Sequence, residues 1–467
     1  MKKITLSIIA LFYFNFFYAQ ILKDSVLSYS TFIQSVIQYH PLVQNIRLQT
    51  IDKSKAYILK SRGFFDPKTY YHFDQKLFQS KNYYSIINGG LKIPTWIGAD
   101  IKTEYNYNTG LYINSSDYLP SNGLWSIGAS LPLLKNLFID ERRWAVKSSR
   151  IDLEMAEQEF NYELLNVLSD ATYKYWQWFE VFNKYLLLKN ITETSKNRLL
   201  ATIQSAQLGD IPAIDTTETS IQYNNFLLQS QLAFIEFQNI TNEIQFYFQW
   251  DKNQFNLSPN FTLYPQTFQA QNTKSIILEK DKIDTIIYQH PAYKKYLFKL
   301  QNLNLEKKFR IEMLKPQLDI TYNALLIPSH PNDLIYNSNN YKWGIQFSFP
   351  LFLRKERGDL KLVNLKIKET RNELEIKKSE LLIKANNYFN LYQTYLNQLV
   401  NINQLIERYQ KMLDAERSKF AAGESSVFLV NARENYLFDA KLKQISFYSK
   451  LNLYKHLLEL SLGQIPN

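Results

Sequence analysis

The chain has 467 residues and contains no cysteine. It therefore has no disulfide framework, no thiolate metal site and no acylated N-terminal cysteine. Beyond the N-terminus, no segment stays apolar over the roughly 18 residues that a bilayer-crossing helix needs. We therefore expect no transmembrane helix.

Motifs of catalysis and cofactor binding are also missing. There is no HExxH, no phosphate-binding glycine loop, no G-x-S-x-G and no dinucleotide fingerprint. The five histidines lack metal-ligand spacing, and no pair of carboxylates stands out as general acid and base. His40 and His290 each precede a proline, so we expect each to lead into a helix that begins at that proline. We expect neither an enzyme nor a bound cofactor or metal.

Glycine is scarce, with 12 residues, and seven of them lie within 63–128. The only glycine within 129–343 is Gly209, and the only one within 359–462, a stretch that also lacks proline, is Gly423. Long stretches without glycine predict long helices, and the glycine-bearing region predicts a β segment.

Residues 1–19 are predicted to be a signal peptide. Two lysines form a basic n-region, residues 4–18 are apolar, and Ala19 is a plausible cleavage residue, although Phe17 departs from the small residue usual at that position. A membrane anchor is the alternative, but the stretch is short for a spanning helix of about 20 residues. We expect the mature chain to be exported.

The formal net charge is +11, from 54 Lys and Arg against 43 Asp and Glu. The lysines are spread along helices, and no run of five basic residues occurs. We therefore interpret the charge as solvated helix faces and expect no nucleic-acid partner.

The chain contains an internal duplication. Four landmarks recur in the same order: QYHP at 38–41 and YQHP at 288–291, FFDPKTYYHFD from 64 and MLKPQLDITYN from 313, WSIGASLPLLKN from 125 and WGIQFSFPLFLR from 343, and the glycines at 209 and 423. Each half reads as helix, β segment, long helix, glycine turn and helix. We predict a first repeat over 20–258, a connector over 259–282 and a second repeat over 283–467.

The β segments, about 67–134 and 316–350, alternate with a period of two. Trp343, Ile345 and Phe347 point one way, and the residues between them point the other. One apolar and one polar face fits a soluble sandwich or an outer-membrane barrel, and the crowded tyrosines and tryptophans favour the barrel.

The two β segments differ in length. The second holds one hairpin, whereas the first holds one hairpin with long loops or two hairpins, and residues 82–122 leave both alternatives open. Four to six strands are fewer than the roughly eight of the smallest membrane barrel. A barrel therefore has to be shared among subunits.

Two long helices are predicted over 141–208 and 355–422, each roughly 100 Å long, within helical hairpins over 141–258 and 355–463. Seven-residue steps in the second give an unbroken apolar row: Leu360, Ile367, Leu374, Leu381, Tyr388, Tyr395, Ile402 and Tyr409. The row three residues later is interrupted by Lys377, Lys384 and Gln398, which indicates a wet interior rather than a dry zipper. The first long helix shows the same spacing at Leu164, Leu168, Ala171, Tyr175, Trp178, Phe182 and Tyr185.

Together these landmarks resemble the TolC-like outer-membrane efflux proteins, over essentially the whole mature chain. The resemblance is carried by the two glycine turns, by the strand–proline elements SLPLL and SFPLF, and by the twofold repeat. It implies a mainly α fold of internally duplicated coiled-coil hairpins. Three copies would form an α-barrel tunnel through the periplasm and share a β-barrel in outer-membrane lipid.

The function implied is that of a passive outer-membrane exit duct in a tripartite efflux or type I secretion system. Its partners would be a periplasmic adaptor and an inner-membrane pump of RND, ABC or similar type. The sequence does not indicate whether the cargo is a drug, a metal ion or a protein. A periplasmic adaptor and an exported structural coiled coil without a pore are the alternatives.

The two turns are the expected periplasmic tips and adaptor contact. The residues assigned to them are Gly209, Asp210, Pro212, Asp215, Gly423, Glu424, Ser425 and Ser426. The glycines supply a positive φ, and Pro212 prevents the helix from continuing. Short polar residues suit caps of the returning helices, namely Asp215, Thr216 and Thr217 at one turn and Ser425 and Ser426 at the other.

Asp215 matches the acid that family members commonly carry six residues after the first tip glycine. We interpret it as an N-cap, with adaptor contact or a charge in the lumen as the alternative. At the second tip, the positions of the acids in some members hold Leu429 and Ala432. We therefore expect no acidic ring there, and an apolar constriction at Phe428 and Leu429 instead.

Overall fold

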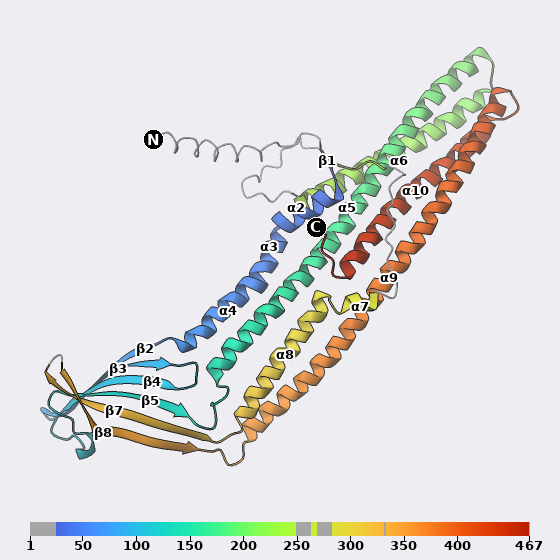
Figure 1. Cartoon of the computed structure of the whole chain (residues 1–467). Helices are drawn as coiled ribbons and strands as arrows, with labels where there is room; N and C mark the ends of the chain where they lie inside the picture. The colour runs from blue at the N-terminus through green and yellow to red at the C-terminus, as the bar shows by residue number, and fades with distance from the viewer. Residues whose placement is uncertain (1–24, 249–262, 269–282, 331–332, 467) are drawn as a thin grey trace, which may run out of the picture. The chain divides into compact units, whose positions relative to one another are not determined.

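The computed structural model describes residues 25–248, 263–268, 283–330 and 333–466 (Figure 1). The predicted signal peptide and most of the predicted connector lie outside these residues. The chain divides into two compact units, one of residues 1–46, 162–287 and 380–467 and the other of 47–161 and 288–379. None of the described helices is long and apolar enough to cross a membrane.

The second unit contains one antiparallel sheet of six strands in the order β2-β3-β4-β5-β7-β8. The strands are β2 (Lys68–Phe78), β3 (Lys81–Pro94), β4 (Asp100–Thr109), β5 (Leu124–Pro132), β7 (Gln317–His330) and β8 (Asp333–Ser348). The first half thus supplies two hairpins, which decides between the two alternatives for residues 82–122. Strands β2 and β8 are the edges of this sheet.

The register of the sheet gives it one apolar face. Tyr322 of β7 lies opposite Ala129 of β5 and Trp343 of β8, and Ile320 lies opposite Leu131 and Ile345. Many side chains of this face are exposed, with Trp343 at 61% and Phe347 at 66%. The predicted alternation is therefore confirmed, and it continues from strand to strand.

Helices make up most of the described chain. The second unit also holds α4 (Lys53–Arg62), α8 (Pro291–Glu312) and the first parts of α5 (Glu141–Leu208) and α9 (Arg354–Ala421). The first unit holds the remainder of α5 and α9 together with α2 (Tyr29–Tyr39), α6 (Ala213–Phe248), α7 (Ile283–Ile287) and α10 (Val427–Ser461). It also contains the parallel pair β1 (Ser25–Leu27) and β6 (Leu263–Pro265), and α3 (Pro41–Arg47) ends at the boundary between the units.

The duplication is visible in element lengths. Helices α5 and α9 each contain 68 residues, and α6 and α10 contain 36 and 35. The predicted mainly α, duplicated fold with a β segment is confirmed.

The predicted apolar row of α5 forms the core of the first unit. Leu164, Leu168, Ala171, Tyr175, Trp178 and Phe182 are all buried. The Tyr175 hydroxyl donates to the carbonyl of Leu27 at 2.9 Å, which ties this core to β1.

The second apolar row of α9 differs from the predicted one. Val363 and Thr370 follow the predicted spacing, but further on the buried row lies four residues after the first, at Ala385, Tyr392, Leu399 and Leu413. Lys384 is exposed one position before this row. An α-helix drifts by about 20° per heptad relative to a 3.5-residue repeat, so the contact row shifts by one residue. The predicted row of packing residues is therefore wrong in this part of α9, and the wet interior of the assembly stays a prediction.

Both His-Pro pairs begin helices, as predicted. Helix α3 starts at Pro41 and α8 starts at Pro291. The Nδ1 atoms of His40 and His290 accept from the backbone N–H of Leu42 at 3.2 Å and of Ala292 at 3.1 Å. Both rings are buried, and burial lowers the pKa of His40 below its ordinary value.

This capping predicts a pH-dependent stability. Because the folded-state pKa of His40 lies below the unfolded value of about 6.5, its contribution is present above pH 6.5 and is lost as the pH falls from there through the folded pKa. We expect the thermal unfolding midpoint to fall between pH 7 and pH 5. His40→Asn keeps a capping acceptor that does not titrate, so it should reduce this fall. An identical pH dependence in both proteins would contradict the assignment.

Candidate functional site at the hairpin turns

The two glycine turns have the same backbone geometry. Gly209 has φ of +82° and Gly423 has φ of +78°. At the first turn the Asp210 N–H donates to Ser205 at 3.0 Å, and at the second the Glu424 N–H donates to Lys419 at 2.9 Å. These are the six-to-one hydrogen bonds that close a helix with a left-handed residue. The prediction that both glycines reverse the chain with a positive φ is confirmed, and their assignment to the periplasmic tips stays a prediction.

The glycines are required by φ rather than by space. A Cβ added to either would meet no atom within 4 Å. Figure 1 shows the two turns at the same end of the first unit, one between α5 and α6 and the other between α9 and α10.

The caps agree with the prediction at one turn only. Ser426 is the N-cap of α10, and its side chain accepts from the Leu429 N–H at 3.4 Å. Ser425 instead donates to Glu416 at 2.5 Å. Its predicted capping role is wrong.

At the other turn, helix α6 begins at Ala213, so the predicted caps Asp215, Thr216 and Thr217 lie inside the helix. The Asp215 N–H donates to the carbonyl of Pro212 at 3.1 Å. Because the fixed φ of proline suits the start of a helix, Pro212 allows α6 to begin before the polar residues. Asp215 then lies in the first turn, where its charge interacts favourably with the helix dipole.

The remaining predicted tip residues lie at the surface. Asp210, Pro212 and Glu424 are exposed. Phe428 and Leu429, in the first turn of α10, are 62% and 38% exposed. On the first hairpin, Leu208 and Ile214 are also exposed, so both turns present apolar side chains.

A buried carboxylate joins the two hairpins behind the turns. Glu434 of α10 is only 4% exposed. It accepts from both guanidinium NH groups of Arg198 on α5, at 2.5 Å for one of them, and from Arg417 on α9 at 3.1 Å. Gln222 on α6 donates to it at 3.5 Å. We call Glu434, Arg198, Arg417, Gln222 and Asn431 the Glu434 cluster; it contains a residue from each of the four helices.

Sequence reasoning missed this cluster. Glu434 continues the apolar row formed by Val427, Val430 and Leu437, all of which are buried. A carboxylate in such a row was the available signal, because an isolated buried charge is expensive unless it is paired. The partners come from 17 to 236 residues away, and periodicity does not reveal them.

The Glu434 cluster is incompletely satisfied. Arg198 also donates to the side-chain oxygen of Asn431 at 3.0 Å. Within the described residues, the buried Gln222 Oε1 and Asn431 Nδ2 atoms have no hydrogen-bond partner. Unpaired buried polar atoms are uncommon and raise the free energy of the packing that contains them.

A second carboxylate fixes the α9–α10 turn. Glu416 accepts from Ser425 at 2.5 Å and from the Nε of Arg433 at 3.5 Å. The hydrogen bond from Ser425 and the nearby Arg433 hold the pKa of Glu416 below its ordinary value. The carboxylate therefore stays ionised and ties the turn to both of its helices.

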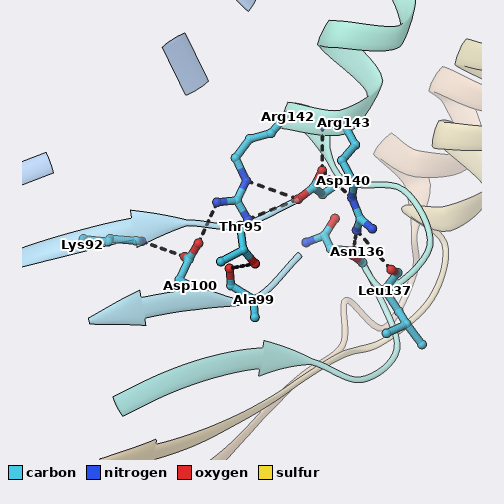
Figure 2. A network of polar contacts seen from close by, with 9 residues as sticks. All are labelled: Lys92, Thr95, Ala99, Asp100, Asn136, Leu137, Asp140, Arg142 and Arg143. Carbon is cyan, nitrogen blue, oxygen red and sulfur yellow. Dashed lines mark hydrogen bonds and ion pairs between the residues drawn. The ribbon is translucent and has the colours of Figure 1, made fainter. Parts of the chain in front are cut away.

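In the other unit, charged residues attach the sheet to the start of α5 (Figure 2). Asp100 of β4 accepts from Lys92 of β3 at 2.9 Å and from Arg142 of α5 at 2.6 Å. Asp140 accepts from the Arg143 N–H at 2.8 Å and from Arg142 at 3.2 Å, so it serves as the N-cap of α5.

Arg143 extends the same network into the chain before the helix. It donates to the carbonyls of Asn136 at 2.5 Å and Leu137 at 3.1 Å. Across the β3–β4 turn, the Thr95 hydroxyl donates to the Ala99 carbonyl at 2.6 Å. The network holds this turn and the strand-to-helix connection in one arrangement.

The architecture defines a class of protein. No protein-family model and no curated protein matches the sequence. Among solved structures, however, the chain has the fold of the TolC-like outer-membrane channels, and the predicted resemblance is confirmed at the level of the fold.

Three of these structures show the extent of the likeness. The outer-membrane channel CmeC of Campylobacter jejuni is 14% identical, with a TM-score of 0.63 over 92% of this chain and 84% of CmeC. The outer-membrane protein VceC of Vibrio cholerae is 10% identical, with a TM-score of 0.66 over 93% and 96%. The open state of the MtrE outer-membrane channel of Neisseria gonorrhoeae is 9% identical, with a TM-score of 0.68 over 94% and 89%.

The turn geometry predicts the effect of substituting the glycine. Gly423→Ala should destabilise the protein by about 1–2 kcal/mol, because a left-handed conformation strains a residue with a Cβ. Gly423→Asn should lose less, since asparagine tolerates this conformation better. Thermal unfolding of the purified variants measures both effects.

Gly358 provides the control. It lies inside α9, and an added Cβ there also meets nothing within 4 Å. Gly358→Ala should therefore be neutral or stabilising by up to about 1 kcal/mol. Equal losses at positions 358 and 423 would contradict the requirement for a positive φ.

Proposed function

We propose that the protein is the outer-membrane exit duct of a tripartite efflux or type I secretion system. One observation carries the proposal: a six-stranded sheet with an exposed apolar face occurs in a chain with the fold of outer-membrane channels. In this role the protein is a passive conduit and not an enzyme. Its surroundings are outer-membrane lipid at the sheet and the periplasm at the helices.

The free sheet edges support assembly into a trimer. Every neighbouring pair in the sheet is antiparallel, so the edge strands β2 and β8 run in opposite directions. Strand β8 of one copy can therefore pair antiparallel with β2 of the next, which removes both edges. Three copies of the six-stranded sheet would give an eighteen-stranded barrel. Barrels of about 16–18 strands enclose an aqueous channel.

The two faces of the sheet suit the two sides of such a barrel. The apolar face, which includes Tyr322, Trp343 and Ile345, would contact lipid, and the polar face would line the lumen. Within this proposal, residues 1–19 are the signal peptide, residues 20–258 and 283–467 are the two repeats, and residues 259–282 are the connector between them.

The hairpin turns are the proposed periplasmic tips. The first turn carries the exposed apolar residues Leu208 and Ile214 and the exposed acid Asp210. The second carries the exposed Phe428 and Glu424. This surface suits contact with a periplasmic adaptor, which would connect the duct to an inner-membrane pump. Asp215 is partly exposed in the first turn of α6 and is a further candidate for this contact or for a charge in the lumen.

Assembly can be tested by disulfide trapping, which has no background because the chain lacks cysteine. Thr69 of β2 and Trp343 of β8 lie on the apolar face. The double variants Thr69→Cys with Tyr341→Cys, Trp343→Cys or Ile345→Cys sample three positions along the edge. At least one should give covalent dimers and trimers on oxidation, because facing strands bring Cα atoms within about 4.4–6.8 Å.

Thr69→Cys with Ala129→Cys is the matched control, because β5 is an interior strand. This variant should stay monomeric on denaturing gels. The same membranes should retain the protein in urea and release it in detergent. Exclusively monomeric products at all three edge positions, together with release by urea, would contradict the proposed duct.

The tip constriction has its own test. Leu429→Ser should raise the conductance of the purified protein in a planar bilayer if apolar side chains close the tip. Leu405→Ser is a matched control, because Leu405 has the same 38% exposure but lies in α9, away from the turns. An unchanged conductance in Leu429→Ser, or an equal increase in both variants, would rule out a constriction at this residue.

A further inference from the structure

A row of lysines crosses the polar face of the sheet. Lys68 of β2 lies opposite Lys92 of β3, which lies opposite Lys102 of β4. The same row continues through Gly128 and Asn323 to Lys342 of β8. Four of the six strands thus place a lysine in one cross-strand row, which we call the lysine row.

The neighbouring rows establish which face this is. One residue further along the strands, the cross-strand row contains Leu91, Ile127, Ala324 and Tyr341 and belongs to the apolar face. Side chains of adjacent rows point to opposite faces of a sheet. The lysine row therefore lies on the polar face, which faces the lumen in the proposed duct.

Two carboxylates on the same face lie close to the row. Asp100 is bound by Lys92 and by Arg142 from α5, so its charge is already compensated. Glu104, two residues beyond Lys102, accepts a hydrogen bond from Tyr70. Lys68, Lys102 and Lys342 form no ion pair with any residue that the structure describes. The row therefore carries a local excess of positive charge.

Asp100 holds Lys92 in place, but no ion pair within the described residues accounts for the lysines at positions 68, 102 and 342. Directly opposed side chains have Cβ atoms about 4.5–5.5 Å apart, and like charges at that distance destabilise a sheet. Lys68, Lys92 and Lys102 are opposed on three successive strands. A local arrangement that opposes stability points to a functional requirement.

We propose that the lysine row makes the lumen of the duct selective for anions, so that small inorganic anions and cargo bearing phosphate or carboxylate groups pass in preference to cations. This inference rests on the proposed function. Three copies of the row would surround the lumen, where walls of low dielectric constant concentrate the field of charged side chains. Rings of basic side chains are a known means by which pores select anions.

The reversal potential of the purified full-length protein in a planar bilayer under a potassium chloride gradient tests the proposal. The wild type should favour chloride over potassium. The triple variant Lys68→Gln, Lys102→Gln, Lys342→Gln should lower the chloride-to-potassium permeability ratio by about tenfold at low ionic strength. The difference should shrink towards 1 M salt, where the screening length falls to about 3 Å.

The charge-preserving triple variant Lys68→Arg, Lys102→Arg, Lys342→Arg is the matched control and should retain the selectivity of the wild type. If the glutamine variant does not assemble, Lys342→Gln alone, on the edge strand, should shift the ratio in the same direction. If the wild type and the glutamine variants form channels of equal selectivity, the proposed role of the lysine row is wrong, while the proposed duct function stands. The absence of any channel would overturn both proposals.

Discussion

An antiparallel sheet with one uncovered apolar face and two unpaired edges is unfavourable in water, because the apolar side chains are hydrated and the edge strands can pair with other chains. The exposed tyrosine, tryptophan and isoleucine side chains of β7 and β8 would be hydrated, and the edge strands would offer free hydrogen-bonding groups to other chains. Lipid removes the first problem, and pairing between copies removes the second. The same constraint that makes the sheet incomplete alone therefore favours both the membrane insertion and the assembly that we propose. Six strands are too few to close around a lumen, since the smallest membrane barrels have about eight.

The helical hairpins meet a different constraint, because their faces must pack over many turns while their ends must reverse. Apolar rows satisfy the packing. Leu188, Phe226 and Phe438 join α5, α6 and α10, and Leu413 joins α9 to α10. The reversals require left-handed residues, and glycine takes this conformation at little cost.

The elements that were predictable from the sequence are those fixed by local physics. The limits of α5, the left-handed glycines 209 and 423 and the His-Pro helix starts follow from helix geometry and from the properties of single residues. The prediction that Asp215 is an N-cap was wrong for a local reason as well. Either Pro212 or one of the polar residues after it could begin the helix, and the sequence does not show which of them does. The prediction of the second apolar row of α9 was wrong because the angular offset between an α-helix and a seven-residue repeat accumulates along a long helix.

The charged groups were not predictable, because each depends on pairing between distant segments. Lys68 and Lys342 are ordinary exposed lysines in the sequence, and only the strand register places them in one row. Arg142 similarly meets Asp100 across 42 residues. Alternation gives the face of each strand, but it gives neither the order of the strands nor the offset between them.

The two charge networks differ in how completely their polar atoms are paired. The network around Asp100 and Asp140 leaves no buried side-chain atom unpaired within the described residues, so separating its partners loses hydrogen bonds and gains nothing in return. The Glu434 cluster contains two unpaired buried atoms, on Gln222 and Asn431. A buried amide atom without a partner has lost its hydrogen bonds to water and gained none in the protein, which raises the free energy of the folded packing. The charge pairs at the sheet thus hold one geometry, whereas behind the hairpin turns the two unpaired amide atoms offset part of the stabilisation that the ion pairs provide.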